Sequence, residues 1–204
     1  MASSKSQKIL DKPEARDKLR VAAARLFAEQ GFSATGVQQI TDAAGVNKAM
    51  LYYYFDSKDK LYEALINEGV WLIESSLSPA VVSKQDISER LRSFLNSYLT
   101  LALDHPEIAA IIFREAFGGV EPGRRKVAEH IRKTIEQMAG MMEDAAAAGR
   151  IRADIDPLMA AYSLLGIANM FISRLIVSKA AFETGSLVEN IMDLFMRGVE
   201  ARKE

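Results

Sequence analysis

Residues 35–55 combine hydrogen-bonding side chains with two short helical patterns, in the sequence TGVQQITDAAGVNKAMLYYYF. Lysine and amide side chains can pair with purine edges in the major groove of DNA, and hydroxyl and ammonium groups suit phosphate oxygens. A small alanine can meet the methyl group of a thymine. The side chains of this segment can therefore bind DNA bases and phosphates, provided that two helices present them outward.

The spacing of apolar residues predicts the first of these two helices. Val37, Ile40 and Ala44 recur at i, i+3 and i+7, which places them on one face of a helix. Thr35 or Gly36 can serve as its N-cap. We expect this helix to end at Ala44.

A turn and a second helix are expected directly afterwards. Gly45 can take the left-handed conformation without steric cost, and Asn47 can cap the next helix. Leu51 and Phe55 are i and i+4 and can face a core. The segment therefore predicts a helix-turn-helix. The residues that point away from the core are expected to be Lys48, Ala49, Tyr52 and Tyr53.

Composition suits a compact protein of one large or two small domains, with 204 residues, 49% of them apolar, and a net charge of -1. The chain contains no cysteine, which excludes disulfides, thiolate zinc sites and cysteine nucleophiles. The first ten residues lack the apolar core of a signal peptide, and the apolar run 157–173 is short for a membrane span. We therefore expect a cytoplasmic location and no membrane.

Charge is distributed unevenly along the chain. Residues 1–60 carry ten Lys/Arg against seven Asp/Glu, a net charge of +3, whereas the remainder carries sixteen against twenty, a net charge of -4. The imbalance is modest, and it places the basic side chains where the DNA-reading segment lies. Lys5, Lys8 and Lys12 leave two interpretations open, a minor-groove arm or a solvated tail.

Helical periodicity runs through almost every segment, and no segment alternates apolar and polar residues between hairpin turns, so we expect an all-α fold. A three-helix head is expected to be joined to a helical body by a long fourth helix, with Pro79 beyond its end. About nine helices are expected, over residues 13–30, 36–44, 47–55, 57–77, 86–104, 106–118 and 124–149, from residue 157, and over 186–202.

The last two expected helices carry more apolar surface than one interior can bury. The helix from residue 157 is apolar nearly all round and contains Gly166 and Ala168, which are small enough to let another helix approach. The last helix carries two apolar stripes, Leu187, Ile191, Leu194 and Gly198 on one side and Val188, Met192, Phe195 and Val199 on the other. We therefore expect a homodimer with an interface formed by Leu165, Gly166, Leu187, Ile191, Leu194 and Gly198.

Aromatic and methionine side chains in the body predict a lining for an apolar or aromatic ligand. Each can equally belong to an ordinary core, but Asn169 stands out because an amide inside an apolar helix needs a hydrogen-bonding partner. The candidate ligand-binding residues are Trp71, Phe94, Tyr98, Phe113, Phe117, Met138, Met142, Tyr162, Asn169 and Met170.

The sequence offers little support for an enzyme or a metal site. It contains no P-loop, dinucleotide fingerprint, Gly-x-Ser-x-Gly or His-Glu-x-x-His motif. We interpret His105 as a helix-start residue, His130 as a residue on a solvated face, and the pair Arg114 and Glu115 as a helix surface. We therefore expect no catalysis, no cofactor and no metal. An enzyme acting on an apolar substrate in the body is the remaining catalytic alternative.

Residues 31–61, GFSATGVQQITDAAGVNKAMLYYYFDSKDKL, resemble the N-terminal region of the TetR family of bacterial transcriptional regulators. They follow its pattern of Gly-aromatic, Thr, Val, Ile, Ala-Gly-Val, Leu-Tyr-x-x-Phe and Lys-x-x-Leu. Thr41 stands where the family often has alanine, and Tyr54 where it often has a histidine that contacts phosphate. Because three consecutive tyrosines on a helix cannot all face DNA, we expect Tyr53 or Tyr54 to be structural.

The resemblance implies which side chains meet DNA. Thr35 and the start of the helix that follows would contact phosphate, and Tyr52 and Lys58 would hold the DNA backbone. Tyr53 is a further candidate. The residues near base edges would be Gln38, Gln39, Asn47, Lys48 and Ala49.

The resemblance also implies a function and an organisation. We expect a flexible tail over residues 1–12, a DNA-binding domain over 13–57 and a ligand-binding and dimerisation domain over 58–204. A homodimeric repressor would bind a near-palindromic operator of double-stranded DNA, and a small apolar or aromatic effector among the fourth to eighth helices would displace the fourth. A TetR-like activator, or a protein-binding sensor with weak DNA affinity, is the alternative.

Overall fold

The structure is a computed structural model and describes residues 12–119, 121 and 123–199. The expected basic arm at Lys5 and Lys8 lies outside this range, as do residues 200–202 of the last expected helix. Within it the chain is α-helical and contains no strand, which confirms the all-α prediction. The helices are α1 (Lys12–Gln30), α2 (Val37–Ala44), α3 (Lys48–Phe55), α4 (Lys58–Val82), α5 (Ile87–Asp104), α6 (Pro106–Ala116), α7 (Gly123–Ala147), α8 (Pro157–Ser178) and α9 (Thr184–Val199).

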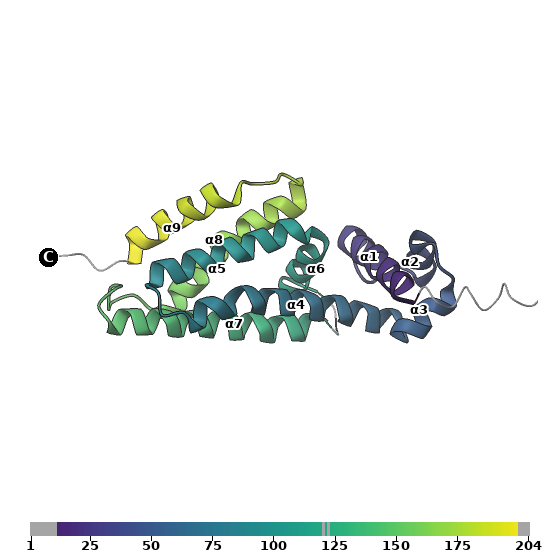
Figure 1. The fold of residues 1–204 in the computed structure, drawn as a ribbon, viewed down its shortest axis with the longest axis horizontal. Helices are drawn as coiled ribbons and strands as arrows, with labels where there is room; N and C mark the ends of the chain where they lie inside the picture. The colour runs from purple at the N-terminus through teal and green to yellow at the C-terminus, as the bar shows by residue number, and fades with distance from the viewer. Residues whose placement is uncertain (1–11, 120, 122, 200–204) are drawn as a thin grey trace, which may run out of the picture.

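The three N-terminal helices form a head at one end of the molecule (Figure 1). Leu19 and Phe27 of α1, Ile40 of α2, and Leu51 and Phe55 of α3 are buried in a common core. This burial stabilises α2 and α3, because isolated helices of eight residues are not stable in water. It also fixes which faces of α2 and α3 remain exposed.

The body contains the six remaining helices. α4 and α7, each 25 residues long, pack along one another, and α5, α8 and α9 lie above them in the view of Figure 1. α6 lies between the head and the rest of the body. Phe94 and Leu95 of α5, Met138 of α7, and Ala161 and Leu164 of α8 are fully buried in the body core.

Side-chain caps set the starts of four helices, as their residue types predict. Asn47 accepts a hydrogen bond from the amide of Met50 at 3.1 Å to start α3, and Ser57 accepts one from Lys60 at 3.1 Å to start α4. The carboxylates of Asp86 and Asp156 cap α5 and α8 in the same way, with Pro157 as the first residue of α8.

Pro79 lies inside α4, so the prediction that the helix ends before it is wrong. α4 continues to Val82, and Leu77 and Ala80 on either side of the proline are buried. Arg90 of α5 donates hydrogen bonds to the carbonyl of Ala80 at 2.7 Å and to that of Val81 at 2.9 Å. This packing and capping offset the hydrogen bond that a proline removes from a helix.

The core of the head does not stop at the expected boundary between residues 57 and 58. Leu61, Tyr62 and Leu65 of α4 are buried in it, together with Ile108 and Ile111 of α6. The first half of α4 and one face of α6 therefore pack with the head. α4 and α6 thus share one core with α2 and α3.

α9 has one buried face rather than two separate stripes. Leu187 and Ile191, expected at a dimer interface, are buried within the chain together with Phe195, whereas Leu194 is 71% exposed and Gly198 is also exposed. The two apolar stripes are adjacent on the helix, and the second stripe and half of the first are buried, where α9 packs against α5 and α8.

Within the chain α8 is buried on one side, and the side expected to meet a second copy is exposed. Ala161, Leu164 and Ala168 face the core, while Met159 and Met170 are among its exposed apolar residues. In length and composition α8 is the one described helix apolar enough to cross a membrane, and 39% of its most apolar window is buried inside the protein. Core helices of folded domains share this composition.

Candidate DNA-binding surface and ligand cavity

The turn between α2 and α3 has the geometry that the sequence predicts. Gly45 adopts φ 65° and ψ 32°, a left-handed conformation, and its amide donates to the carbonyl of Asp42 at 3.2 Å. The amide of Val46 donates to Thr41 at 3.0 Å. Two residues after Gly45, Asn47 begins the cap of α3. The short connection places α3 across α2 as a separate helix that can enter a groove.

The outer face of α3 carries the side chains expected there. Lys48, Ala49, Tyr52 and Tyr53 are all exposed, because Leu51 on the opposite face is fully buried. The ammonium group of Lys48 lies 5.9 Å from the centre of the Tyr52 ring. This contact holds a cation beside a phenol ring on the exposed face of α3, a suitable arrangement for a DNA backbone and base edges.

The two glutamines of α2 are exposed and make hydrogen bonds within the head. Gln39 accepts a hydrogen bond from the amide of Gly36 at 2.7 Å, so its side chain caps α2. Gln38 donates to the carboxylate of Asp42 at 2.8 Å. Each amide retains free hydrogen-bonding capacity toward solvent, because one of its two polar atoms is left unused.

The structure gives Thr35 and Lys58 roles inside the head. Thr35 is 1% exposed, and its hydroxyl donates to the carbonyl of Gly31 at 2.7 Å, so this side chain is not open to phosphate. The ammonium group of Lys58 donates to the carbonyls of Phe32 at 3.0 Å and Thr35 at 2.9 Å. It also lies 4.1 Å from the centre of the Phe32 ring. Lys58 thus ties the start of α4 to the loop before α2.

The tyrosine triplet divides between surface and core. Tyr53 is 65% exposed, whereas Tyr54 is half-buried and packs edge-on against Tyr53 with the ring centres 5.0 Å apart. Nearby, Thr41 is buried and donates its hydroxyl to the carbonyl of Gln38 at 3.1 Å. Tyr54 and Thr41, the two departures from the family pattern, therefore both serve the packing of the head.

A cavity of about 340 Å³ lies in the body among α4, α5, α6, α7 and α8. Its volume is near the lower end of the range for small-molecule sites, about 300 to 1,000 Å³. Most of the residues that line it are apolar. Five of the expected ligand-binding residues are among them: Tyr98, Phe113, Phe117, Tyr162 and Asn169.

The other five candidates lie elsewhere. Phe94, Met138 and Met142 are fully buried in the body core, where they fill space rather than line the cavity. Trp71 is 63% exposed on α4 and Met170 is 70% exposed on α8. Helical periodicity identifies such residues as apolar but does not distinguish a core position from a cavity wall.

His130 and Thr134 of α7 line the cavity, although the sequence did not indicate them. The expectation that His130 lies on a solvated face is wrong, because its side chain is buried and its Nε2 lies 3.4 Å from the Thr134 hydroxyl. Burial lowers the pKa of His130, against the opposing effect of Glu74, whose carboxylate oxygen is 3.4 Å from Nδ1. At neutral pH the imidazole is therefore uncharged.

Tyr98 and Asn169 form a hydrogen-bonded pair at the cavity. The Tyr98 hydroxyl donates to Oδ1 of Asn169 at 2.9 Å, so the expected partner of this amide is present. The Tyr98 ring stacks on Phe94 with the ring centres 5.4 Å apart. Burial raises the pKa of Tyr98 to about 12, which keeps the phenol protonated as the donor.

Arg114 and Glu115 link α6 to the head, which corrects their interpretation as a helix surface. Arg114 donates to the carbonyls of Phe27 at 2.8 Å and Ala28 at 2.9 Å in the last turn of α1. Glu115 is 1% exposed and accepts a hydrogen bond from the Tyr62 hydroxyl at 2.5 Å. His105, in contrast, precedes α6 as its N-cap residue, as expected.

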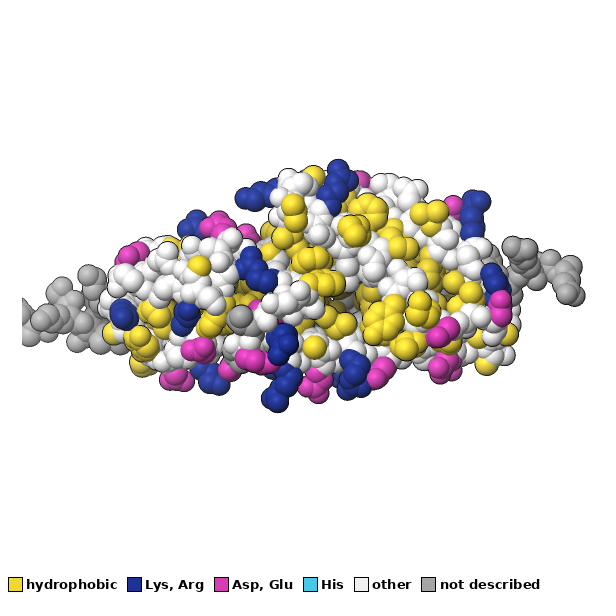
Figure 2. Space-filling model, turned by 180° about the vertical axis from the view of Figure 1, so that it is seen from behind, with side chains coloured by type: hydrophobic (Ala, Val, Ile, Leu, Met, Phe, Trp, Pro, Cys, Tyr) yellow, Lys and Arg dark blue, Asp and Glu magenta, His cyan; other side chains and the backbone are white. Residues whose placement is uncertain are grey.

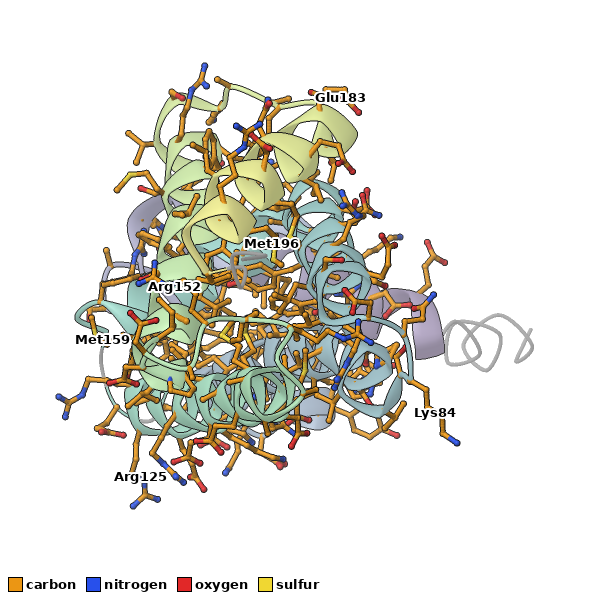
Figure 3. The ribbon with its side chains drawn as sticks, turned by 90° about the vertical axis from the view of Figure 1, so that its left-hand side faces the viewer. Lys84, Arg125, Arg152, Met159, Glu183 and Met196 are labelled. Carbon is orange, nitrogen blue, oxygen red and sulfur yellow. The ribbon has the colours of Figure 1, made fainter. Side chains whose placement is uncertain are left out.

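Exposed apolar side chains form a line along the outer side of α8. Figure 2 shows hydrophobic side chains gathered on this face of the body, and Figure 3 shows Met159 at its outer edge, on the side opposite Lys84. Gly166 is exposed with open space around it, whereas Leu165, also expected at the interface, is buried. The α8 face consists of Met159, Tyr162, Gly166, Met170 and Val177.

These features define a class of protein: a helix-turn-helix head with an exposed reading helix, joined to a helical body with an apolar cavity. The chain belongs to the TetR family of bacterial regulatory proteins. Residues 19–65 match the family model described as bacterial regulatory proteins, tetR family. Residues 84–173 match the model described as tetracyclin repressor-like, C-terminal domain. The family resemblance of the sequence is thereby confirmed.

Individual proteins show how far the similarity extends. The transcriptional activator FasR of Mycolicibacterium smegmatis is 35% identical over 89 residues, which are 44% of this chain and 41% of FasR. The match thus spans less than half the length of that relative. FasR is named as a transcriptional regulator, which supports a regulatory rather than a catalytic role for this chain.

Two solved structures share the fold. The TetR family regulator PfmR of Thermus thermophilus has a TM-score of 0.76 at 22% identity, covering 88% of this chain and 97% of that one. AibR, in complex with isovaleryl coenzyme A and operator DNA, has a TM-score of 0.73 at 24% identity, covering 89% and 97%. At these identities the similarity concerns the fold alone.

Proposed function

We propose that the chain is a ligand-responsive transcriptional repressor that binds a near-palindromic operator as a homodimer and is released by a small apolar effector. The observation that carries the proposal is the position of α6. Phe113 and Phe117 line the cavity, while Arg114 and Glu115 between them hold α1 and α4. A molecule that displaces α6 will therefore displace the head.

The close packing of α6 on α4 supports this coupling. Gly69 of α4 lines the cavity, and a methyl group added there would lie 2.6 Å from a side-chain atom of Ile112 and 2.9 Å from one of Ile108. The two helices are therefore in close contact at Gly69, so a shift of α6 would displace α4 as well. An effector thus has two routes to the head, through α6 directly and through α4.

The exposed side chains of the head supply the DNA contacts. Base edges are read by Asn47, Lys48 and Ala49 at the start of α3, with Gln38 and Gln39 of α2 beside them. Tyr52 and Tyr53 hold the DNA backbone. Thr35 and Lys58, which the structure engages internally, position the loop before α2 instead of touching phosphate.

The exposed apolar face of α8 supports the proposed homodimer. A second copy of α8 can pack on it, because Gly166 and Gly198 leave room for close helix approach. Leu194 of α9 is a further exposed apolar residue available to the partner, whereas Leu165, Leu187 and Ile191 are buried within the chain. The dimer sets the distance between the two heads.

Head spacing controls DNA affinity in this account. Half-sites read by helix-turn-helix dimers lie about 34 to 36 Å apart or a multiple of that distance. An effector that binds more tightly to a dimer with a different head spacing weakens DNA binding. The loss of DNA affinity cannot exceed the ratio of the effector's affinities for the two spacings. Coupling free energies of roughly 1 to 3 kcal/mol correspond to about 5- to 150-fold in affinity.

The experiment that tests the proposal is an electrophoretic shift assay with DNA flanking the gene that encodes the chain. The wild type should bind with a steep salt dependence. Lys48→Ala should weaken binding about tenfold or more, because a lysine contact to a base edge is lost. Lys84→Ala, a lysine change in the loop after α4, is the control. Equal binding by all three proteins would contradict the proposed reading helix.

An activator is the second candidate. FasR is named as a transcriptional activator, which favours this candidate. A head of the same kind, bound to DNA, can promote transcription instead of blocking it. A reporter gene under the bound promoter distinguishes the two, because deletion of a repressor raises expression and deletion of an activator lowers it.

A further inference from the structure

We propose that the cavity selects an uncharged ligand, an apolar chain or ring that carries the carbonyl oxygen of an ester, amide or thioester. A free carboxylate or an ammonium group on the same skeleton is excluded. The proposal rests on the proposed function in taking this cavity as the effector site. The source of the selectivity is the absence of charged side chains from the described lining.

The described lining contains no lysine, arginine, aspartate or glutamate. Its polar side chains are those of Tyr98, His105, His130, Thr134, Tyr162 and Asn169. His105 and Tyr162 are exposed, Tyr98 and Asn169 are half-buried, and His130 and Thr134 are buried. His130 is neutral at neutral pH because burial lowers its pKa.

The nearest charged groups are already engaged outside the cavity. The carboxylate of Glu74 lies 3.4 Å from Nδ1 of His130 and 3.5 Å from the ammonium group of Lys133. Glu74 and Lys133 are exposed, on α4 and α7. Arg114 and Glu115 on α6 are directed toward α1 and Tyr62. A charged ligand would therefore enter without a counter-charge.

Burial of an unpaired charge is strongly unfavourable. An ionised group moved into apolar surroundings loses its hydration and shifts toward its neutral form unless an opposite charge meets it. A carboxylic acid would have to bind protonated, and a quaternary ammonium group has no neutral form. The same skeleton with an uncharged oxygen avoids both costs.

The pair formed by Tyr98 and Asn169 provides the specific contact for that oxygen. Oδ1 of Asn169 accepts from Tyr98, which leaves the Nδ2 amide hydrogens without a partner among the described residues. They are donors, and a carbonyl oxygen is their natural acceptor. Because the Tyr98 ring is stacked on Phe94, the hydroxyl holds the amide in a fixed orientation.

The test uses three probes with one ten-carbon skeleton on the full chain: methyl decanoate, decanoate and decyltrimethylammonium. Affinities are measured by isothermal titration calorimetry at neutral pH. Methyl decanoate should bind at least tenfold more tightly than either charged probe. Equal or tighter binding of a charged probe, or no binding of the ester, would overturn the proposal.

Two variants locate the contact. Asn169→Leu removes the amide at nearly constant volume and should weaken the ester about tenfold, because its carbonyl then lacks a buried donor. Tyr98→Phe keeps the stacked ring and should weaken the ester less. Asn96→Leu, the same kind of change on the exposed face of α5, is the matched control and should leave the affinity unchanged. Unchanged ester affinity in both cavity variants would show that Tyr98 and Asn169 do not bind the carbonyl, and it would contradict the proposed contact.

The shift assay on the same preparations separates this inference from the proposed function. Ester selectivity without DNA binding would contradict the regulator and leave the cavity assignment standing. DNA binding without ester selectivity would contradict the cavity assignment alone.

Discussion

The hydroxyl of Tyr62 donates a 2.5 Å hydrogen bond to the carboxylate of Glu115, which joins α4 to α6 inside the core of the head. Burial and the adjacent carboxylate raise the pKa of Tyr62, so the phenol remains the donor. The Tyr62 ring also packs edge-on against Phe27 of α1, with the ring centres 4.9 Å apart. One residue of the connecting helix thus contacts both the head and the cavity helix.

Tyr62→Phe should lower the free energy of unfolding by about 2 to 3 kcal/mol, because a buried carboxylate loses its donor. Urea denaturation followed by circular dichroism measures this change. Glu63→Gln is the control: it breaks the exposed pair of Glu63 and Lys60, and such pairs contribute about 1 kcal/mol or less. Equal losses in the two variants would show that the Tyr62 bond contributes no more than a surface contact.

Arg114→Met should loosen the end of α1. The last carbonyls of this helix lose their two hydrogen-bond donors while the aliphatic packing is kept. Hydrogen exchange followed by mass spectrometry should show faster exchange at residues 26–32. Arg132→Met, which removes an exposed pair with Glu136 on α7, should not change exchange there. Unaltered protection in both variants would remove the link between α6 and the head.

His130 should make the protein less stable in mild acid. Its folded pKa lies below the ordinary value of 6.5, so the unfolded chain binds a proton that the folded chain does not. Stability contributed by the neutral imidazole is present above pH 6.5 and is lost as the pH falls from there toward the folded pKa.

Melting temperatures at pH 7.5 and 5.5 measure this effect. The decrease should be smaller for His130→Asn, which cannot take up the proton, than for the wild type. His105→Asn changes an exposed histidine and serves as the control. A wild-type decrease identical to that of His130→Asn would contradict the assignment.

Met170→Glu should dissociate the proposed dimer, because it places a charge at the centre of the α8 face. Val82→Glu puts the same charge at an equally exposed apolar position on α4 and should leave the dimer intact. Analytical ultracentrifugation distinguishes these outcomes. A monomeric wild type, or a dimeric Met170→Glu variant, would refute an interface on α8.

Local patterns in the sequence predicted the helix-turn-helix well. The left-handed turn at Gly45, the cap at Asn47 and the buried pair Leu51 and Phe55 all depend on neighbours a few residues away. The start of α8 at Asp156 is of the same kind. Such features are set by backbone conformation and helical period, which a single sequence displays directly.

Long-range contacts were not predictable in this way. Arg114 reaches α1 across 87 positions of the chain, and Glu115 reaches Tyr62 across 53. The charged neighbours of His130 predict a position on the surface, yet the side chain is buried on the inner face of α7. The cavity lining depends on how five helices pack, so periodicity alone could name apolar residues but not separate Phe113 from Phe94.

The central claim, that two copies of α3 read one operator at a fixed spacing, is tested most directly by selecting bound duplexes from a random DNA library. We predict an enriched inverted repeat whose half-site centres lie one helical turn, about 34 to 36 Å, or a multiple of it apart. Enrichment should be lost with Lys48→Ala. Enrichment of a single unrepeated site, or of no sequence at all, would contradict it.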